Sequence, residues 1–202
     1  AKIIGFKDPS SIYYIGNGVC SKRFKPANPE TREKARRTFN LQTDSLVIGI
    51  VSRIVYEKGI KELINVFKKL CNKYNNIQLL ICGSRLKSDY DRSIDKNILE
   101  LTKEMPEKVI WTRHIENTED AYKAMDIFCL PSHREGLPVT ILEAMMSGIP
   151  VISTDIRGPR EEIIDNHTGL ICLPKNEDSL YKKLEMLIID KDKRERFGER
   201  AR

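Results

Sequence analysis

The sequence contains few aromatic, cysteine and histidine residues and no long hydrophobic run. Because no stretch of about 18 apolar residues occurs, it predicts no membrane-spanning helix, and neither end has the pattern of a signal peptide. The five cysteines are odd in number, and no two have C-x-x-C spacing. This argues against a zinc site or a disulfide framework and favours a reducing compartment. Since the histidines share no ligand-like spacing, we expect no metal ion.

The charge balance is basic, with 35 Lys and Arg against 29 Asp and Glu and a formal net charge of +6. Such an excess fits nucleic acid, an anionic membrane face, phosphorylated small molecules or a solvated Lys-rich surface, and charge alone does not choose among them. Aromatic residues make up only 7% of the chain and are not interleaved with the Lys and Arg clusters. This weakens the nucleic-acid interpretation, because bases stack on aromatic side chains.

Short apolar runs alternate with helical patterns from residue 46 onward. Strands that are apolar on both faces and alternate with helices indicate a parallel sheet covered on both sides. We therefore predict a doubly wound, Rossmann-like α/β domain of about six strands with helices on both faces. The predicted strands are 46–51, 77–82, 108–112, 127–130, 150–154 and 169–172, with a further candidate at 12–15. The predicted helices are 60–71, 91–105, 118–125, 138–147, 160–164 and one from 176 onward.

The loops that follow the strands hold the candidate site, because ligands bind beyond the carboxyl ends of strands in an open parallel sheet. Arg53 leaves the end of the first strand, and Lys58 lies where the next helix begins. Two cations beside the positive end of a helix repel it unless an anion joins them. A phosphate or diphosphate would supply that anion. The alternative is that both are solvated surface residues. Gly83, after the second strand, lies at the same edge.

The loop after the fourth predicted strand leads into a helix and carries two glutamates. Glu135 lies on the loop, and Glu143 lies about a turn and a half into the helix. Carboxylates beside an anion site fit if they accept hydrogen bonds from sugar or ribose hydroxyls. The alternative is an isolated surface glutamate and an isolated helix-face glutamate. The amides at the helix start form a ready anion cradle and belong to Gly136, Leu137, Val139 and Thr140.

Taken together, these motifs resemble the donor-binding half of the glycosyl transferases group 1 family, retaining enzymes of the GT-B fold. The matching segments are 17–19, 52–53, 57–59, 126–132, 135–138, 143–144, 148–151 and 168–170. The resemblance implies that residues 1–202 form one nucleotide-sugar-binding domain, with residues 1–11 as the remnant of an interdomain linker. It also implies that the N-terminal, acceptor-binding domain is absent, so that this chain binds donor and transfers nothing alone.

Roles for individual residues follow from the same resemblance. Arg53 and Lys58 would grip the donor diphosphate and stabilise the leaving nucleotide. Glu135 would face the transferred sugar, and Glu143 would accept from the ribose hydroxyls. The amides after Glu135 would meet the phosphates. The remaining nucleotide-binding residues would be Arg113, His114 and Ile115, mainly through their backbone against the base, together with Gly83.

The resemblance further implies transfer of a sugar from a nucleotide diphosphate sugar, UDP before GDP, to a saccharide or lipid-linked glycan in polysaccharide assembly, without a cofactor or a metal. We expect no nucleic-acid partner and a cytoplasmic location, with the inner face of the membrane as a second place for a peripheral full-length protein. Two alternatives stay open: another nucleotide-binding α/β enzyme such as a dehydrogenase, and a basic anion- or membrane-binding module.

The sequence departs from the usual family pattern at three places. Cys20 stands where the family often has Asp, and Arg113 stands where it often has Gly. Residues 157–161 read Arg-Gly-Pro-Arg-Glu instead of Gly-Gly-x-Pro-Glu, which makes these arginines candidates to face the acceptor. We also expect Asp126 to be structural and His133 to face solvent.

Overall fold

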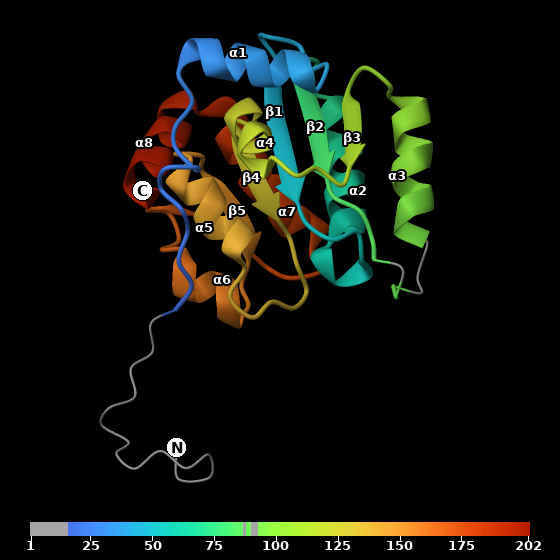
Figure 1. Cartoon of the computed structure of the whole chain (residues 1–202). Coiled ribbons are helices and arrows are strands. Elements are labelled where there is room, and N and C mark those ends of the chain that lie inside the picture. The colour runs from blue at the N-terminus through green and yellow to red at the C-terminus, as the bar shows by residue number, and fades with distance from the viewer. Residues whose placement is uncertain (1–15, 87, 90–92) are drawn as a thin grey trace, which may run out of the picture.

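The computed structural model describes residues 16–86, 88–89 and 93–202, so the candidate strand at 12–15 lies outside the described residues. Six parallel strands of the described part form one sheet in the order β3-β2-β1-β4-β5-β6 (Figure 1). The predicted doubly wound α/β fold is thereby confirmed. The strands are β1 (Leu46–Val51), β2 (Ile77–Cys82), β3 (Val109–Arg113), β4 (Ile127–Leu130), β5 (Val151–Thr154) and β6 (Gly169–Cys172).

Helices cover both faces of the sheet, with α4 and α5 on one side and α2 and α7 on the other (Figure 1). Every residue of β2, β4 and β5 is buried, as expected for strands covered on both faces. The helices are α1 (Pro29–Thr38), α2 (Ile60–Cys71), α3 (Ser93–Glu104), α4 (Thr118–Ala124), α5 (Val139–Met146), α6 (Arg157–Glu162), α7 (Glu177–Ile189) and α8 (Lys191–Ala201), with a 3₁₀ turn, η3 (Tyr56–Lys58), before α2.

The helices differ from the prediction at three places. The prediction missed α1, which begins after Asn28, whose side chain accepts from the backbone N–H of Thr31 at 2.8 Å. The single predicted C-terminal helix is two helices, because Asp190 ends α7 and caps α8 by accepting from the N–H of Lys193. Helix α6 begins three residues earlier than the predicted start at 160.

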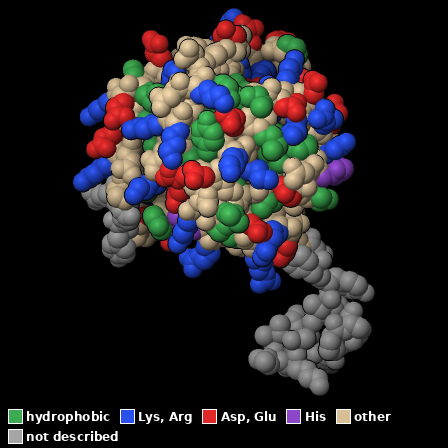
Figure 2. Space-filling model, turned by 180° about the vertical axis from the view of Figure 1, so that it is seen from behind, with side chains coloured by type: hydrophobic (Ala, Val, Ile, Leu, Met, Phe, Trp, Pro, Cys, Tyr) green, Lys and Arg blue, Asp and Glu red, His purple; other side chains and the backbone are tan. Residues whose placement is uncertain are grey.

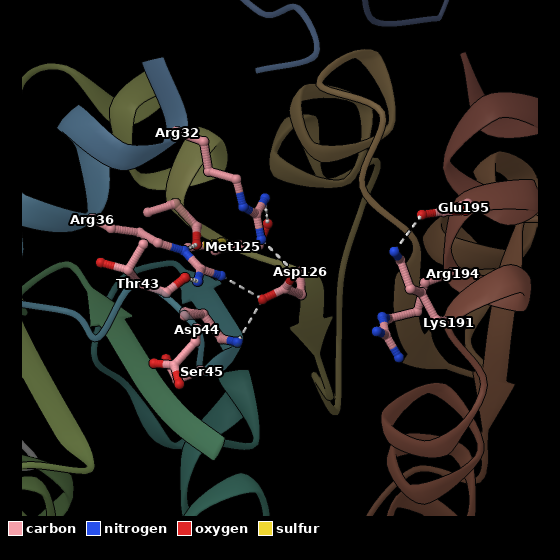
Figure 3. Close-up of polar contacts among 12 residues, drawn as sticks. Arg32, Arg36, Thr43, Asp44, Ser45, Met125, Asp126, Lys191, Arg194 and Glu195 are labelled. Carbon is pink, nitrogen blue, oxygen red and sulfur yellow. Dashed lines mark hydrogen bonds and ion pairs between the residues drawn. The ribbon is translucent and has the colours of Figure 1, made fainter. Parts of the chain in front are cut away.

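An ionic cluster around the buried Arg36 joins α1 to the amino ends of the two central strands (Figure 3). Both Arg32 and Arg36 of α1 pair with Asp126, which lies just before β4, and the distance from Arg36 Nη2 to Asp126 Oδ2 is 2.7 Å. The N–H of Val47 in β1 donates to the same carboxylate at 2.7 Å. Arg36 is 3% exposed, so its buried guanidinium group needs the Asp126 carboxylate as a counter-charge. The structural role predicted for Asp126 is therefore confirmed.

The face covered by α2 and α7 carries interspersed acidic and basic side chains (Figure 2). Lys69 pairs with Glu177 at 2.9 Å, and Lys73 pairs with Glu185 at 2.9 Å. Basic side chains of α2 and of the residues that follow it are therefore paired with acidic side chains of α7. On this face the described residues form no continuous basic surface. In the described part of the chain, no helix has the length and apolar character needed to cross a membrane.

We predict that Arg36→Ala lowers the free energy of unfolding by about 3 kcal/mol, because it removes one partner of a buried ion pair. The matched control is Arg37→Ala on the same helix, which loses only the exposed pair with Glu33. That control should cost about 0.5 kcal/mol or less. Urea unfolding of both variants measures the difference, and equal losses would contradict the role assigned to the buried cluster.

Candidate functional site

The sheet order places the candidate site at the carboxyl ends of β1 and β4. These two strands are neighbours, with Ile48 opposite Ile127, although β2 and β3 lie between them in sequence. The order of connections reverses at this point, and such a reversal creates a crevice between the loops that leave the two strands. The loops concerned are 52–59 and 131–138, the same segments that the sequence singled out.

Backbone contacts hold the two loops together. The N–H of His133 donates to the carbonyl of Glu57 at 2.7 Å. Gly59 has a φ of 67°, and a Cβ atom there would lie 1.9 Å from the carbonyl oxygen of Pro131. Only glycine therefore combines this left-handed backbone with so close an approach. The start of α2 is thus fixed against the end of β4.

Lys58 and Glu135 meet across these loops. The distance from Lys58 Nζ to Glu135 Oε1 is 2.6 Å, and the two side chains are 18% and 9% exposed. The hydroxyl of Ser132 also donates to Glu135 Oε1 at 2.6 Å. Two residues predicted from separate motifs thus form one ion pair, which lies mostly out of water at the crevice between β1 and β4. Ser132 is a third member that the sequence did not single out.

His133 does not face solvent, so that expectation was wrong. Its side chain is only 5% exposed, and its Nε2 lies 2.9 Å from Glu62 Oε1. The ring also packs edge-on against Tyr56, with the ring centroids 4.9 Å apart. The backbone hydrogen bond from His133 to Glu57 holds the loop against η3, so that the imidazole packs on this turn. His133 therefore supports the turn that presents Lys58.

A pocket of about 290 Å³ adjoins the crevice, and we call it the carboxyl-edge pocket. Arg53 lies at its rim, with its side chain 54% exposed and 3.4 Å from Asp89. The Gly83 backbone comes close to Ser52, since a Cβ atom there would lie 1.8 Å from the Ser52 carbonyl oxygen. The pocket is lined by Val51, Ser52, Arg53, Cys82, Gly83, Ser84, Leu86, His114, Ile115, Thr118 and Thr140. Five of the predicted site residues, Arg53, Gly83, His114, Ile115 and Thr140, are thus brought together.

Arg113 is placed differently from its neighbours. Its guanidinium lies over the ring of Trp111, 3.3 Å from the centroid, and its side chain does not line the carboxyl-edge pocket. Its φ of 64° is left-handed, which explains why glycine suits this position in the resembling family. The ring of Trp111 is held in turn by a hydrogen bond from Nε1 to the Gly83 carbonyl at 2.9 Å.

Helix α5 offers free backbone donors at this edge. Its N-cap is Pro138, and within the described part of the chain no side chain caps the first turn, so the amides at its start remain available to a ligand. Asn17 donates to the Leu137 carbonyl at 2.9 Å and fixes the approach to the helix. A Cβ atom on Gly158 of α6 would lie 1.9 Å from the Gly136 carbonyl oxygen, so α6 packs directly beneath this loop. The side chain of Val139 is exposed at the helix start.

Glu143 lies one turn further along α5 than Thr140. The hydroxyl of Tyr122 donates to Glu143 Oε2 at 2.8 Å and approaches the Thr140 carbonyl at 3.3 Å. Burial raises the pKa of Glu143, while the Tyr122 hydrogen bond opposes that rise. Tyr122, itself buried, thus donates to one oxygen of Glu143, and the carboxylate has further lone pairs that can accept a hydrogen bond.

Metal ligation has no candidate in the described ranges. Among these residues no group of three or more His, Cys, Asp or Glu side chains is arranged to hold an ion. All five cysteines lie in the described part and are free thiols, four of them buried.

A parallel sheet of this order, with cations, helix amides and carboxylates at its carboxyl edge, defines a Rossmann-like α/β domain. The family described as glycosyl transferases group 1 matches residues 31–202. The chain belongs to this family. Membership favours the glycosyltransferase interpretation of the sequence over a dehydrogenase or a basic binding module.

Known relatives agree with this membership. The capsular polysaccharide biosynthesis glycosyltransferase CapM of Staphylococcus aureus is 33% identical over 186 residues, covering 92% of this chain and 47% of CapM. The C-terminal domain of the group 1 protein LpcC from Francisella tularensis is 27% identical with a TM-score of 0.77, covering 91% of this chain and 94% of that domain. S. aureus TarM, solved in complex with UDP, is 25% identical with a TM-score of 0.69, covering 80% of this chain and 33% of TarM.

The chain spans about half the length of the curated relatives it matches. The GT-B C-terminal domain is the part it resembles. Its assignment as a single donor-binding domain with a linker remnant at 1–11 stays a prediction.

We predict that Gly158→Ala destabilises the protein by about 1–3 kcal/mol, because the added methyl group overlaps the Gly136 carbonyl and forces α6 away from the loop. The control is Gly18→Ala, where a Cβ atom meets nothing within 4 Å. Thermal unfolding measures both. An unchanged melting temperature for Gly158→Ala would contradict the close packing of α6 beneath the loop.

Proposed function

We propose that this chain is the donor-binding domain of a retaining glycosyltransferase that transfers a sugar from a nucleotide diphosphate sugar to a saccharide or lipid-linked glycan. The observation that carries the proposal is the Lys58–Glu135 ion pair, 2.6 Å long and mostly buried, beside the uncapped start of α5. A cation, free amides and a carboxylate in one crevice suit a ligand with phosphates at one end and hydroxyls at the other.

The chemistry follows from this arrangement. The difficult step is departure of the nucleoside diphosphate from an oxocarbenium-like sugar. Arg53, Lys58 and the amides after Glu135 stabilise the developing negative charge, and the amides, which the fold holds in place, need little reorganisation. Glu135 accepts from hydroxyls of the transferred sugar. Attack from the same face, with the leaving phosphate taking the acceptor proton, retains the configuration and asks no nucleophile of this chain.

The nucleoside is assigned to the carboxyl-edge pocket. Glu143 accepts from the ribose hydroxyls, and the base lies against the backbone at Arg113, His114 and Ile115, with Gly83 close by. We favour UDP over GDP as the nucleotide of the donor. The complex of TarM with UDP supports this choice.

The acceptor is assigned to a second domain that faces the same edge. The chain spans about half the length of its relatives, and CapM is named for capsular polysaccharide biosynthesis. We therefore place the full-length protein in cytoplasmic glycan assembly, at the inner face of the membrane where the acceptor is lipid-linked. This chain alone is expected to bind donor and not to transfer sugar. Sustained transfer by the 202 residues would contradict the assignment of the acceptor to a second domain.

We predict that Arg53→Ala weakens UDP binding by about 1.5–3 kcal/mol, because the nucleotide loses a charged hydrogen-bond partner. Calorimetric titration with UDP, GDP and NAD measures the affinity and ranks the nucleotides. The matched control is Lys61→Ala, which removes an exposed cation from α2 and should leave UDP binding unchanged. Equal UDP affinity in wild type and Arg53→Ala would remove Arg53 from the site.

We further predict that Glu143→Gln weakens UDP by about 1–2 kcal/mol while leaving pyrophosphate unaffected, because only UDP carries the ribose hydroxyls. Tyr122 donates to Glu143 at 2.8 Å and can donate equally to the amide oxygen of the variant, so the fold should be retained. Parallel titrations with the two ligands provide the comparison. Equal weakening of both ligands would rule out the ribose assignment.

A further inference from the structure

A second pocket, of about 420 Å³, lies at the amino edge of the sheet, and we call it the amino-edge pocket. It is lined by residues just before β4 and β5 and by side chains of α1 and α8, so it lies at the edge opposite the candidate donor site. None of the residues assigned to the donor lines it. Its charged lining residues are Arg32, Asp126, Lys191, Arg194 and Glu195.

The α1 side of the amino-edge pocket carries more positive than negative charge. Arg32 and Arg36 share the single carboxylate of Asp126, which also accepts a hydrogen bond from the N–H of Val47. One arginine is enough to balance that carboxylate, so the second leaves a positive charge in excess. The side chain of Arg32 is 32% exposed and lines the pocket, whereas Arg36 is 3% exposed.

The α8 side adds two further cations, which lie across from Arg32 and Asp126 in Figure 3. Arg194 Nη1 donates to two carbonyls in the last turn of α7, one of them that of Ile188 at 3.1 Å. Within the described ranges no carboxylate pairs with Arg194. Lys191 lies 3.6 Å from Glu195, and because both side chains are mostly exposed this ion pair is weak. Basic side chains at the pocket thus outnumber the carboxylates.

The fold holds the two sides of the pocket in place. A Cβ atom on Gly198 would lie 2.1 Å from the carbonyl oxygen of Gly148, so α8 packs directly against the loop before β5. Arg194 is tethered to the end of α7, and Arg32 is tethered to Asp126. Two guanidinium groups are therefore ordered before any ligand binds, which lowers the entropy that binding costs.

The chemistry of the lining favours a phosphate ester. Each guanidinium group has five N–H donors, and the hydrogen bonds of Arg194 use only Nη1, so donors remain for a ligand. The planar guanidinium fork matches the oxygens of a phosphate, and the Lys191 ammonium group adds a point charge. Met125 and Ile149 also line the pocket, and they offer apolar contacts to the organic part of an ester.

We propose that the amino-edge pocket binds the phosphate group of a phosphate monoester between Arg32 of α1 and Arg194 of α8, with Lys191 as a third cation. This site is separate from the donor site and does not depend on the proposed function. The monoester is a soluble sugar or glycerol phosphate, or the head group of phosphatidic acid, since all of these present a phosphate with one ester bond.

Calorimetric titration with glycerol 3-phosphate tests the site directly. Arg194→Gln should bind this probe about tenfold more weakly than wild type, because the phosphate loses a charged hydrogen-bond partner. The glutamine amide can still donate to the α7 carbonyls, so we expect the fold to be retained. The matched control is Arg196→Gln, the same change at an exposed arginine of α8 that does not line the pocket, and it should bind as wild type does.

Two further variants guard against a loss of folding and against binding at the donor site. Lys191→Gln changes only an exposed side chain and should weaken glycerol 3-phosphate about threefold. Arg53→Ala, at the opposite edge, should leave the affinity for glycerol 3-phosphate unchanged even where it weakens UDP. Loss of glycerol 3-phosphate binding in Arg53→Ala would overturn the proposal, because the phosphate would then occupy the donor site.

Vesicles separate the two sources of the phosphate. If the natural ligand is a lipid, wild type should sediment with phosphatidylcholine vesicles that contain phosphatidic acid and not with phosphatidylcholine alone, and Arg194→Gln should sediment less than Arg196→Gln. If the ligand is soluble, glycerol 3-phosphate binds and neither kind of vesicle does. Equal binding of both probes by wild type, Arg194→Gln and Lys191→Gln, or no binding of either probe by wild type, would overturn the proposal.

Discussion

The carboxylate of Asp126 is the contact on which the placement of the site depends. The N–H of Val47 donates to the Asp126 side chain at 2.7 Å, and the N–H of Asp126 donates to the Val47 carbonyl at 2.8 Å. This fixes the register of β1 and β4 at their amino ends, and Arg36 closes the cluster from α1. Because both strands are short and parallel, a register fixed at one end also fixes where they end. Lys58 and Glu135 follow those ends, so their meeting depends on a contact at the opposite edge of the sheet.

At the carboxyl edge, backbone contacts rather than ion pairs fix the positions of the loops that follow β1 and β4. Gly59 lies against the Pro131 carbonyl, and the N–H of His133 donates to Glu57. These contacts leave little freedom to the loops after β1 and β4. A site built this way holds its cation and its carboxylate in place before any ligand arrives, which is the condition for electrostatic stabilisation of a leaving group.

Most of the fold and the main residues of the candidate site could be proposed from the sequence because they depend on local patterns. Strands buried on both faces must be apolar, and Lys58 and Glu135 lie in the loops that follow two such strands. Helix α1 was missed because its buried face includes Arg36, whose partner Asp126 lies 90 positions away. His133 was misplaced for the same reason, since Glu62 lies 71 positions away. Periodicity does not detect a polar residue that is buried because of a distant partner.

The basic excess of +6 therefore says little about the site itself, where the important cation is already neutralised. With Lys58 bound to Glu135, a bare anion must displace a carboxylate to reach the ammonium group, and the displaced carboxylate loses its cation. A ligand that brings phosphate to Lys58 and hydroxyl groups to Glu135 replaces both partners at once. Under the proposed function, the ion pair discriminates against simple phosphates and in favour of ligands that join phosphate to sugar, so part of the specificity arises from the interaction that the ligand must replace.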